Sequence, residues 1–237
     1  MPAAKSWFKV HARVVLAQGS ATLTQLSDPD NTVALLDLAT VGLNGADLRR
    51  ELDDRLTQLA DHLTAQVQAA TWVDEARAEV RQTAANCFEW RKRLFARLRY
   101  AATCGADPDT SFSRTFGFRT LPRARAQGLL RELPRLFQAL GQLEATLQPH
   151  GIRHAFVEEG RLHHGRLQAA QGDLDSALQA RKTATQAVRS GHTQVRDYLL
   201  RLVAADEAAA LEFGRAPCFS LSVLRPPEPT SSGEPAG

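Results

Sequence analysis

The sequence is poor in cysteine, and its three cysteines, Cys87, Cys104 and Cys218, lie far apart with no CxxC pair. An odd number of widely spaced cysteines does not predict a disulfide framework. The amino terminus, MPAAKSWFKVHARVV, also lacks the continuous apolar segment and small-residue cleavage site of a secretory signal. We therefore expect reduced thiols in a cytoplasmic protein.

Long apolar runs and catalytic motifs are also missing. No stretch approaches the ~20 apolar residues that a helix needs to cross a bilayer, so no membrane partner is expected. The sequence contains no GxSxG, Walker A, GxGxxG or HExxH motif. These absences favour a protein that is not an enzyme and that binds no cofactor and no metal.

Lysine is rare, since only four of the 29 basic residues are lysine and the others are arginine. A GC-rich genome produces the same bias, so arginine content alone does not predict nucleic-acid binding. The fractions of apolar (43%) and charged (23%) residues are typical of a globular chain. Abundant alanine and leucine, which are strong helix formers, predict a mainly α fold.

The two ends of the chain read as strands. Apolar residues alternate with polar ones over 8–16 and 21–26, a further apolar segment covers 32–41, and Phe219, Leu221 and Val223 alternate at the other end. We expect an N-terminal β segment over 1–42, a C-terminal strand over 215–225 and a small antiparallel β element that joins them. An amphipathic helix from Lys5 to Leu26 is the alternative for the first segment. The Pro- and Ser-rich residues 226–237 are expected to be disordered.

Residues 43–214 predict an antiparallel bundle of four to five long helices. The first begins at Asn44, a good N-cap, and a capping box at Thr71 and Asp74 begins a second that ends before Gly105. A third helix is expected over 120–148, with Pro134 as a kink or as its first turn. After a corner at 149–151, helix continues to about residue 189, and a last helix covers 192–213.

Leucines in the third helix recur in steps of four and three, which is typical of a seam that packs on a neighbouring helix. On this pattern we predict a non-catalytic assembly or adaptor protein that forms homo-oligomers. The predicted oligomer interface consists of Leu129, Leu133, Leu136, Leu140, Leu143 and Leu147.

The basic segment 91–135 indicates an alternative function, because it holds eleven basic residues and three acidic ones while the whole chain has a net charge of +3. Guanidinium groups bind phosphates and aromatic rings stack on bases, so this segment could bind DNA or RNA. The candidate residues are Trp90, Arg91, Arg93, Arg97, Arg99, Tyr100, Arg114, Arg119, Arg123 and Arg125. The opposing interpretation is that the arginines pair with acids of the region 47–79.

Histidines and glutamates at helical spacing indicate a second alternative, a metal-dependent helical-bundle enzyme. Such spacing can present ligands for Zn²⁺ or iron on one helix face. The residues concerned are His150, His154, Glu158, Glu159, His163 and His164. Because no Glu-x-x-His pair occurs, the pattern is also that of a solvated polar helix.

Overall fold

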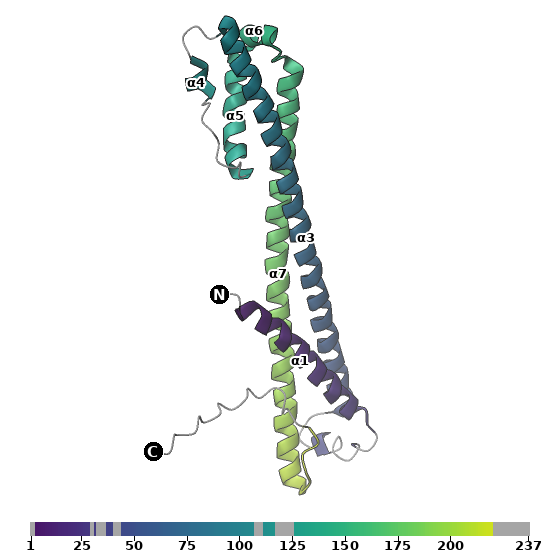
Figure 1. Cartoon of the computed structure of the whole chain (residues 1–237). Helices are drawn as coiled ribbons and strands as arrows, with labels where there is room; N and C mark the ends of the chain where they lie inside the picture. The colour runs from purple at the N-terminus through teal and green to yellow at the C-terminus, as the bar shows by residue number, and fades with distance from the viewer. Residues whose placement is uncertain are drawn as a thin grey trace, which may run out of the picture. The chain divides into compact units, whose positions relative to one another are not determined.

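The computed structural model describes residues 3–28, 31, 37–39, 44–106, 111–116 and 126–219. The chain divides into two compact units. Unit 1 combines Met1–Gln68 with Lys182–Gly237, and unit 2 is Ala69–Arg181. All the regular secondary structure in the described residues is helical, so the fold is mainly α, but the predicted antiparallel β element is not present there (Figure 1).

The expected N-terminal strands are wrong, because residues Ala3–Leu26 form one helix, α1. The buried residues of its second part fall in steps of three and four, at Ala12, Val15, Gly19, Thr22 and Leu26. Glycine and threonine occupy two of these five positions, so the hydrophobic pattern does not reveal the helical period. The hydroxyl of Thr22 donates to the carbonyl of Gln18 (3.0 Å), which satisfies it within the helix.

The other predicted strands meet different outcomes. Residues 37–39 form a helical turn, and the rest of 32–41 lies outside the described residues. Cys218 and Phe219 are neither strand nor helix, while 220–225 and the predicted disordered tail 226–237 also lie outside the described residues.

Two helices run through both units: α3, Gly45–Ala101, with 57 residues, and α7, His154–Phe213, with 60 residues. The start of α3 agrees with the predicted cap, since Asn44 Oδ1 accepts the amide of Ala46 at 3.1 Å. The breaks predicted near Thr71 and at 190–191 are wrong. Gly191 is buried against α3. A Cβ at this position would lie 3.2 Å from His62 and 3.3 Å from Leu59, so the glycine allows the two helices to pack closely.

Unit 1 is built from α1, the first part of α3 and the last part of α7. Its core contains Leu48, Leu52, Leu56 and Leu59 of α3, which face Val188, Val195, Leu199 and Leu202 of α7. Ala12 and Val15 of α1 and Phe219 near the end of the described chain join the same core. The hydroxyl of Tyr198 donates to the carbonyl of Leu48 at 2.9 Å, so the polar end of this ring is satisfied inside the unit.

Unit 2 adds a third helix, α5, Ala126–Gln142, which lies beside α3 and α7 (Figure 1). Trp90 of α3 is fully buried, stacks on Phe156 of α7 and donates its indole N–H to the Phe156 carbonyl at 2.9 Å. A Cβ at Gly160 would lie 2.3 Å from the Trp90 ring, so α7 approaches the indole through this glycine. The short helix α4, Ser111–Phe116, contributes Phe112 and Phe116 to the core.

Helix α5 continues through Pro134, which lies inside it and is exposed. Proline has no amide hydrogen to donate to the carbonyl four residues earlier, which is that of Leu130. His164 Nε2 lies 3.4 Å from this carbonyl oxygen and replaces the missing donor when it carries the proton. Pro134 therefore causes no break, and α5 ends at Gln142, followed by α6, Glu144–Leu147, and a 3₁₀ turn, η3, Gln148–His150.

Three glycines with positive φ mark the ends of helices. Gly105 (φ 85°) lies in the π-helical turn η2, Ala102–Ala106, that ends α3, and Gly214 (φ 65°) follows α7. Gly151 (φ 81°) closes the turn before α7. The predicted stops at Gly105, at 149–151 and at Gly214 are therefore confirmed.

Candidate functional site

The first candidate residue, Arg91, is buried inside unit 2, with 4% of its surface exposed. Its Nη2 and Nε atoms lie 2.6 and 3.0 Å from Glu132 Oε1 of α5, and its guanidinium lies 4.1 Å from the Phe95 ring centroid. A buried cation needs such a partner, because desolvation of an unpaired charge is costly. Arg91 therefore anchors α5 to α3.

The next two arginines of the segment contact α7 and the turn before it. Arg93 Nη2 donates to Glu159 Oε1 at 2.5 Å, and this hydrogen bond lowers the pKa of the Glu159 carboxyl. Arg97 donates to the Gly151 carbonyl at 2.5 Å and covers the Phe156 ring at 4.0 Å. Trp90, the predicted stacking residue, is enclosed between Phe137 and Phe156. These side chains make intramolecular contacts.

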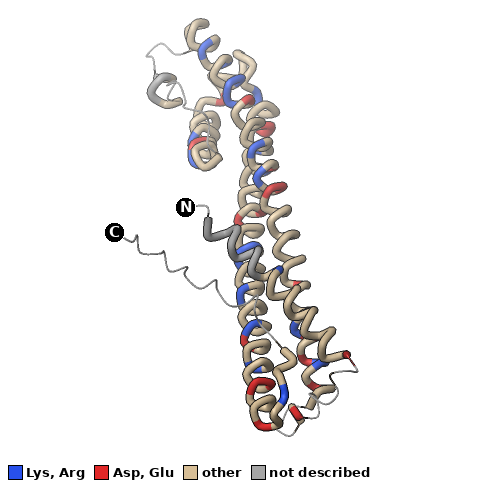
Figure 2. Tube along the Cα trace, turned by 60° about the horizontal axis from the view of Figure 1, so that its bottom comes forward, with Lys and Arg blue, Asp and Glu red and all other residues tan. Residues whose placement is uncertain are grey.

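The remaining nucleic-acid candidates fall into two groups. Arg99 and Tyr100 are exposed, and the Tyr100 ring lies edge-on to His150 at 6.4 Å. Arg114 lies in α4, but its side chain is outside the described part, and so are Arg119, Arg123 and Arg125. Figure 2 shows basic and acidic positions interspersed along the described helices.

The acids that pair with this segment differ from the expected ones. The region 47–79 was the expected source, yet Arg91 and Arg93 pair with Glu132 of α5 and Glu159 of α7. Within 47–79, Arg55 pairs with Glu51 and Arg77 with Asp74. Charges that lie close in sequence on α3 therefore pair within that helix, whereas the buried pair joins two helices.

The leucines of the predicted oligomer interface lie in the core of unit 2. Five of them, Leu129, Leu133, Leu136, Leu140 and Leu147, are buried among α3 and α7 residues, and Leu143 packs against the same core. The seam is thus filled by helices of the same chain, and an interface between copies needs another surface.

The histidines are brought together in pairs with glutamates rather than as a cluster. His154 Nε2 lies 3.9 Å from Glu158, and His163 Nε2 lies 3.6 Å from Glu159. His150 contacts Tyr100, and His164 contacts Phe137 and the Leu130 carbonyl. Among the described residues no group of three or more metal-ligating side chains gathers.

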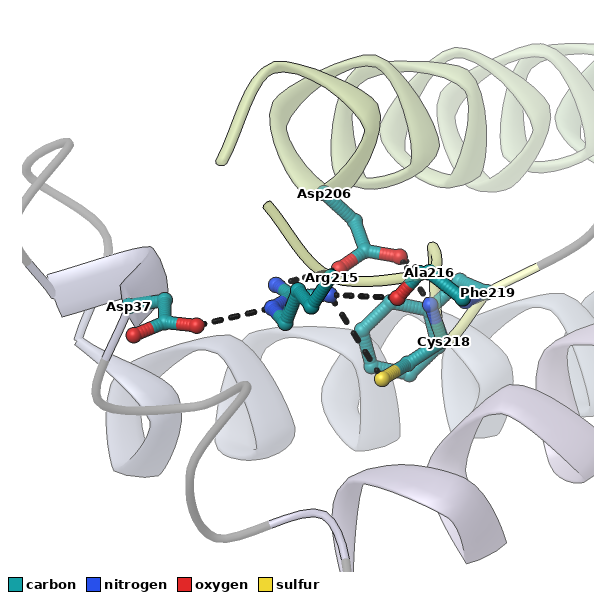
Figure 3. A network of polar contacts seen from close by, with 6 residues as sticks. All are labelled: Asp37, Asp206, Arg215, Ala216, Cys218 and Phe219. Atoms are coloured by element: carbon teal, nitrogen blue, oxygen red, sulfur yellow. Dashed lines mark hydrogen bonds and ion pairs between the residues drawn. The ribbon is translucent and has the colours of Figure 1, made fainter. Parts of the chain in front are cut away.

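A polar network in unit 1, centred on Asp206 of α7, is not among the sites expected from the sequence (Figure 3). This fully buried carboxylate accepts the amides of Cys218 (2.6 Å) and Phe219 (2.9 Å) and a hydrogen bond from Arg215 Nη2 (2.8 Å). Arg215 Nε also donates to Asp37 at 2.7 Å. Burial opposes the charge of Arg215, but the hydrogen bonds that it donates to Asp37 and Asp206 outweigh burial and raise its pKa.

The Asp206 network fixes the segment 214–219 to α7, so that Phe219 enters the core of unit 1. A signal for it was present in the sequence. Asp206 lies between Leu202 and Ala209 at steps of four and three, which is a core position of the helix that an aspartate occupies only with partners.

An open groove of about 420 Å³ lies in unit 2 between α3 and α7. Asp74, Arg77, Val80 and Arg81 of α3 and Leu174 of α7 line it. Asp74 Oδ1 lies 3.4 Å from Arg77 Nη1, and Arg81 Nε donates to the Arg77 carbonyl at 3.3 Å. Among the described residues no carboxylate pairs with Arg81. The groove therefore offers an apolar floor and charges of both signs.

No family model, curated protein or solved structure matches the chain. Within the described residues, no helix combines the length and the apolar character that crossing a membrane requires.

Proposed function

We propose that this chain is a non-catalytic assembly or adaptor protein that associates with copies of itself through the exposed faces of its long helices. An exposed apolar strip on α7 in unit 1 carries the proposal. Leu200 and Leu211 are eleven residues apart, which is about three helical turns, and the exposed Ala204 and Ala208 lie between them on the same face. Leu211 is 86% exposed.

Single exposed leucines are ordinary in soluble proteins, but apolar residues that recur at helical spacing on one exposed face are typical of a helix that packs on another helix. The leucines of α5 cannot serve this purpose, since they are buried in unit 2. The three free cysteines support a reducing, cytoplasmic location.

Light scattering of the full chain between about 1 and 100 µM tests this function. We expect a mass that corresponds to two or more chains. Joint replacement of Leu200 and Leu211 by Glu should lower the associated fraction. The matched control is Arg201→Glu, at an exposed position of α7 about 100° around the helix from Leu200. A monomer at every concentration contradicts the proposal.

Nucleic-acid binding is the competing proposal. Among the described candidate residues, the exposed Arg99 and Tyr100 support it. Trp90, Arg91 and Arg97 do not, because they form hydrogen bonds within unit 2. It predicts binding of single- or double-stranded DNA or RNA that weakens steeply with salt. Fluorescence anisotropy at about 50 mM salt and at higher salt tests it, and the absence of binding at low salt excludes it.

A further inference from the structure

The groove in unit 2 lies on the same side of α3 and α7 as helix α5. Arg91, which holds α5 through Glu132, and Arg77, which lines the groove, are two heptads apart on α3 and therefore lie on the same side of that helix. On α7, Leu174 packs against the core that contains the leucines of α5. The same side of the α3 and α7 pair is thus covered by a helix in one stretch and open in the next.

In the open stretch, α3 and α7 contact each other through Val73, Ala76 and Ala177. Because these side chains are small, α3 and α7 lie close together here and bury little apolar side-chain surface between them. Leu174 is only half-buried, and Leu178, one turn further along α7, is 40% exposed. The floor of the groove therefore keeps apolar surface that a further helix could cover.

The rim of the groove carries one acid, Asp74, and two arginines, Arg77 and Arg81. Asp74 and Arg81 lie seven residues apart on one face of α3, which separates them by about 10 Å along the helix axis. A two-fold axis across the groove midway between them brings Asp74 of each copy opposite Arg81 of the other. In such an arrangement both ion pairs form together above Val80 and Leu174 of the two copies, and the two Arg77 side chains lie near the axis, each paired with Asp74 of its own chain.

We propose that this groove is the contact between two copies of the chain, which pack α3 against α3 in antiparallel orientation around such a two-fold axis. The inference rests on the proposed function and adds a second contact surface, in unit 2, to the α7 strip in unit 1. A two-fold contact uses the same patch on both partners, so this contact by itself joins two chains into a dimer. Asp74 then lies between Arg77 of its own chain and Arg81 of the partner copy.

A charge-exchange experiment tests this contact on the full chain. In Asp74→Arg, two arginines face each other at both ion pairs, and in Arg81→Asp two aspartates do. Each variant alone should dimerise on the order of tenfold more weakly or worse, because like charges are placed in contact. An equimolar mixture of the two variants should restore the dimer, since every pair then joins an arginine to an aspartate.

Glu75→Arg is the matched control, because it makes the same change of charge at an exposed position next to Asp74 but outside the groove. It should leave the dimer mass unchanged, and circular dichroism should show equal helix content in all variants. A monomeric wild type overturns the proposed function together with this contact. A wild-type dimer that survives both charge reversals overturns this contact and leaves the proposed function standing.

Discussion

The two units bury charges of opposite sign for the same purpose. In unit 1 the buried charge is an anion, Asp206, which holds the segment 214–219 through Arg215 and two backbone amides. In unit 2 it is a cation, Arg91, which holds α5 through Glu132 and the face of Phe95. In each unit a buried ion pair fastens a further segment to one of the two long helices, α7 in unit 1 and α3 in unit 2.

The difference lies in how each charge is satisfied. Asp206 is fully buried and accepts three hydrogen bonds, two of them from backbone amides that no side-chain substitution removes. Arg91 relies on one carboxylate, that of Glu132, whose side chain is partly exposed, and on an aromatic ring. Removal of the anchor should therefore cost more in unit 1 than in unit 2.

Asp206→Ala should produce the largest effect. It leaves Nη2 of Arg215 and the amides of Cys218 and Phe219 without their acceptor, and breaking a buried pair in this way costs about 3–5 kcal/mol of unfolding free energy. Urea unfolding followed by circular dichroism measures it. Asp197→Ala, an exposed aspartate on the same helix, should change the free energy by less than about 0.5 kcal/mol. Equal effects of the two variants contradict the role of Asp206.

Glu132→Gln should cost less, on the order of 2 kcal/mol, because the ring of Phe95 still faces the guanidinium of Arg91. The exposed pair of Lys92 and Glu89 provides the control, and Glu89→Gln should cost below about 1 kcal/mol. A cost for Glu132→Gln above that of Asp206→Ala would reverse the comparison between the units.

Glycine-to-alanine substitutions compare how tightly the two units are packed. Gly160→Ala places a methyl group against the rigid ring of Trp90, and such overpacking costs about 1–3 kcal/mol. Gly19→Ala in unit 1 meets the end of the Leu56 side chain, which can rotate, so it should cost less. Gly172→Ala has open space and should stabilise the protein by about 0.5–1 kcal/mol through helix propensity. Urea unfolding curves of the three variants distinguish these effects.

The last expected effect is absent at neutral pH and appears only at alkaline pH. Burial raises the pKa of the Cys87 thiol in unit 2 from 9.0 to about 11 and that of Tyr198 in unit 1 from 10.0 to about 12. A raised pKa means that the folded state holds the proton more tightly than the unfolded state does. The stabilisation is therefore complete below pH 9 and is lost as pH rises through 11 for Cys87, and from 10 through 12 for Tyr198.

Urea midpoints measured from pH 8 to 12 check this dependence. Cys87→Ala should remove the earlier fall and Tyr198→Phe the later one. Thiol labelling at neutral pH provides a second readout, in which the exposed Cys104 reacts first and the buried Cys87 reacts only on unfolding. Rapid labelling of Cys87 in the folded protein would contradict its burial.

The long helices were predictable where their own residues carry the signal. Leu48, Leu52, Leu56 and Leu59 repeat at helical spacing, and they form the core of unit 1 as that pattern implies. The stops at Gly105 and Gly214 were predictable as well, since glycine readily adopts the positive φ found at both. The continuity of α7 was not predictable, because glycine has a low helix propensity. Gly191 is nevertheless helical and packs closely on Leu59.

The candidate sites were less predictable than the helices. The sequence shows that residues 91–135 are rich in arginine, but it does not show that Arg91 and Arg97 point into the molecule. The sequence also shows a row of leucines on the third helix, but these leucines pack on helices of the same chain. The groove was not predictable either, since Asp74 and Arg81 line it together with Leu174, which comes from another helix.

The sequence by itself determined that the chain is mainly helical and where several helices end, because propensity, capping and glycine conformation are local properties. Only the tertiary structure decided that residues 3–26 are helix, which charges are buried and which apolar face stays open. These outcomes depend on contacts between residues far apart in the chain, such as Gly19 with Leu56 and Arg91 with Glu132. Burial sets the cost of leaving a charge or an apolar surface unpartnered, and burial exists only once the helices have packed.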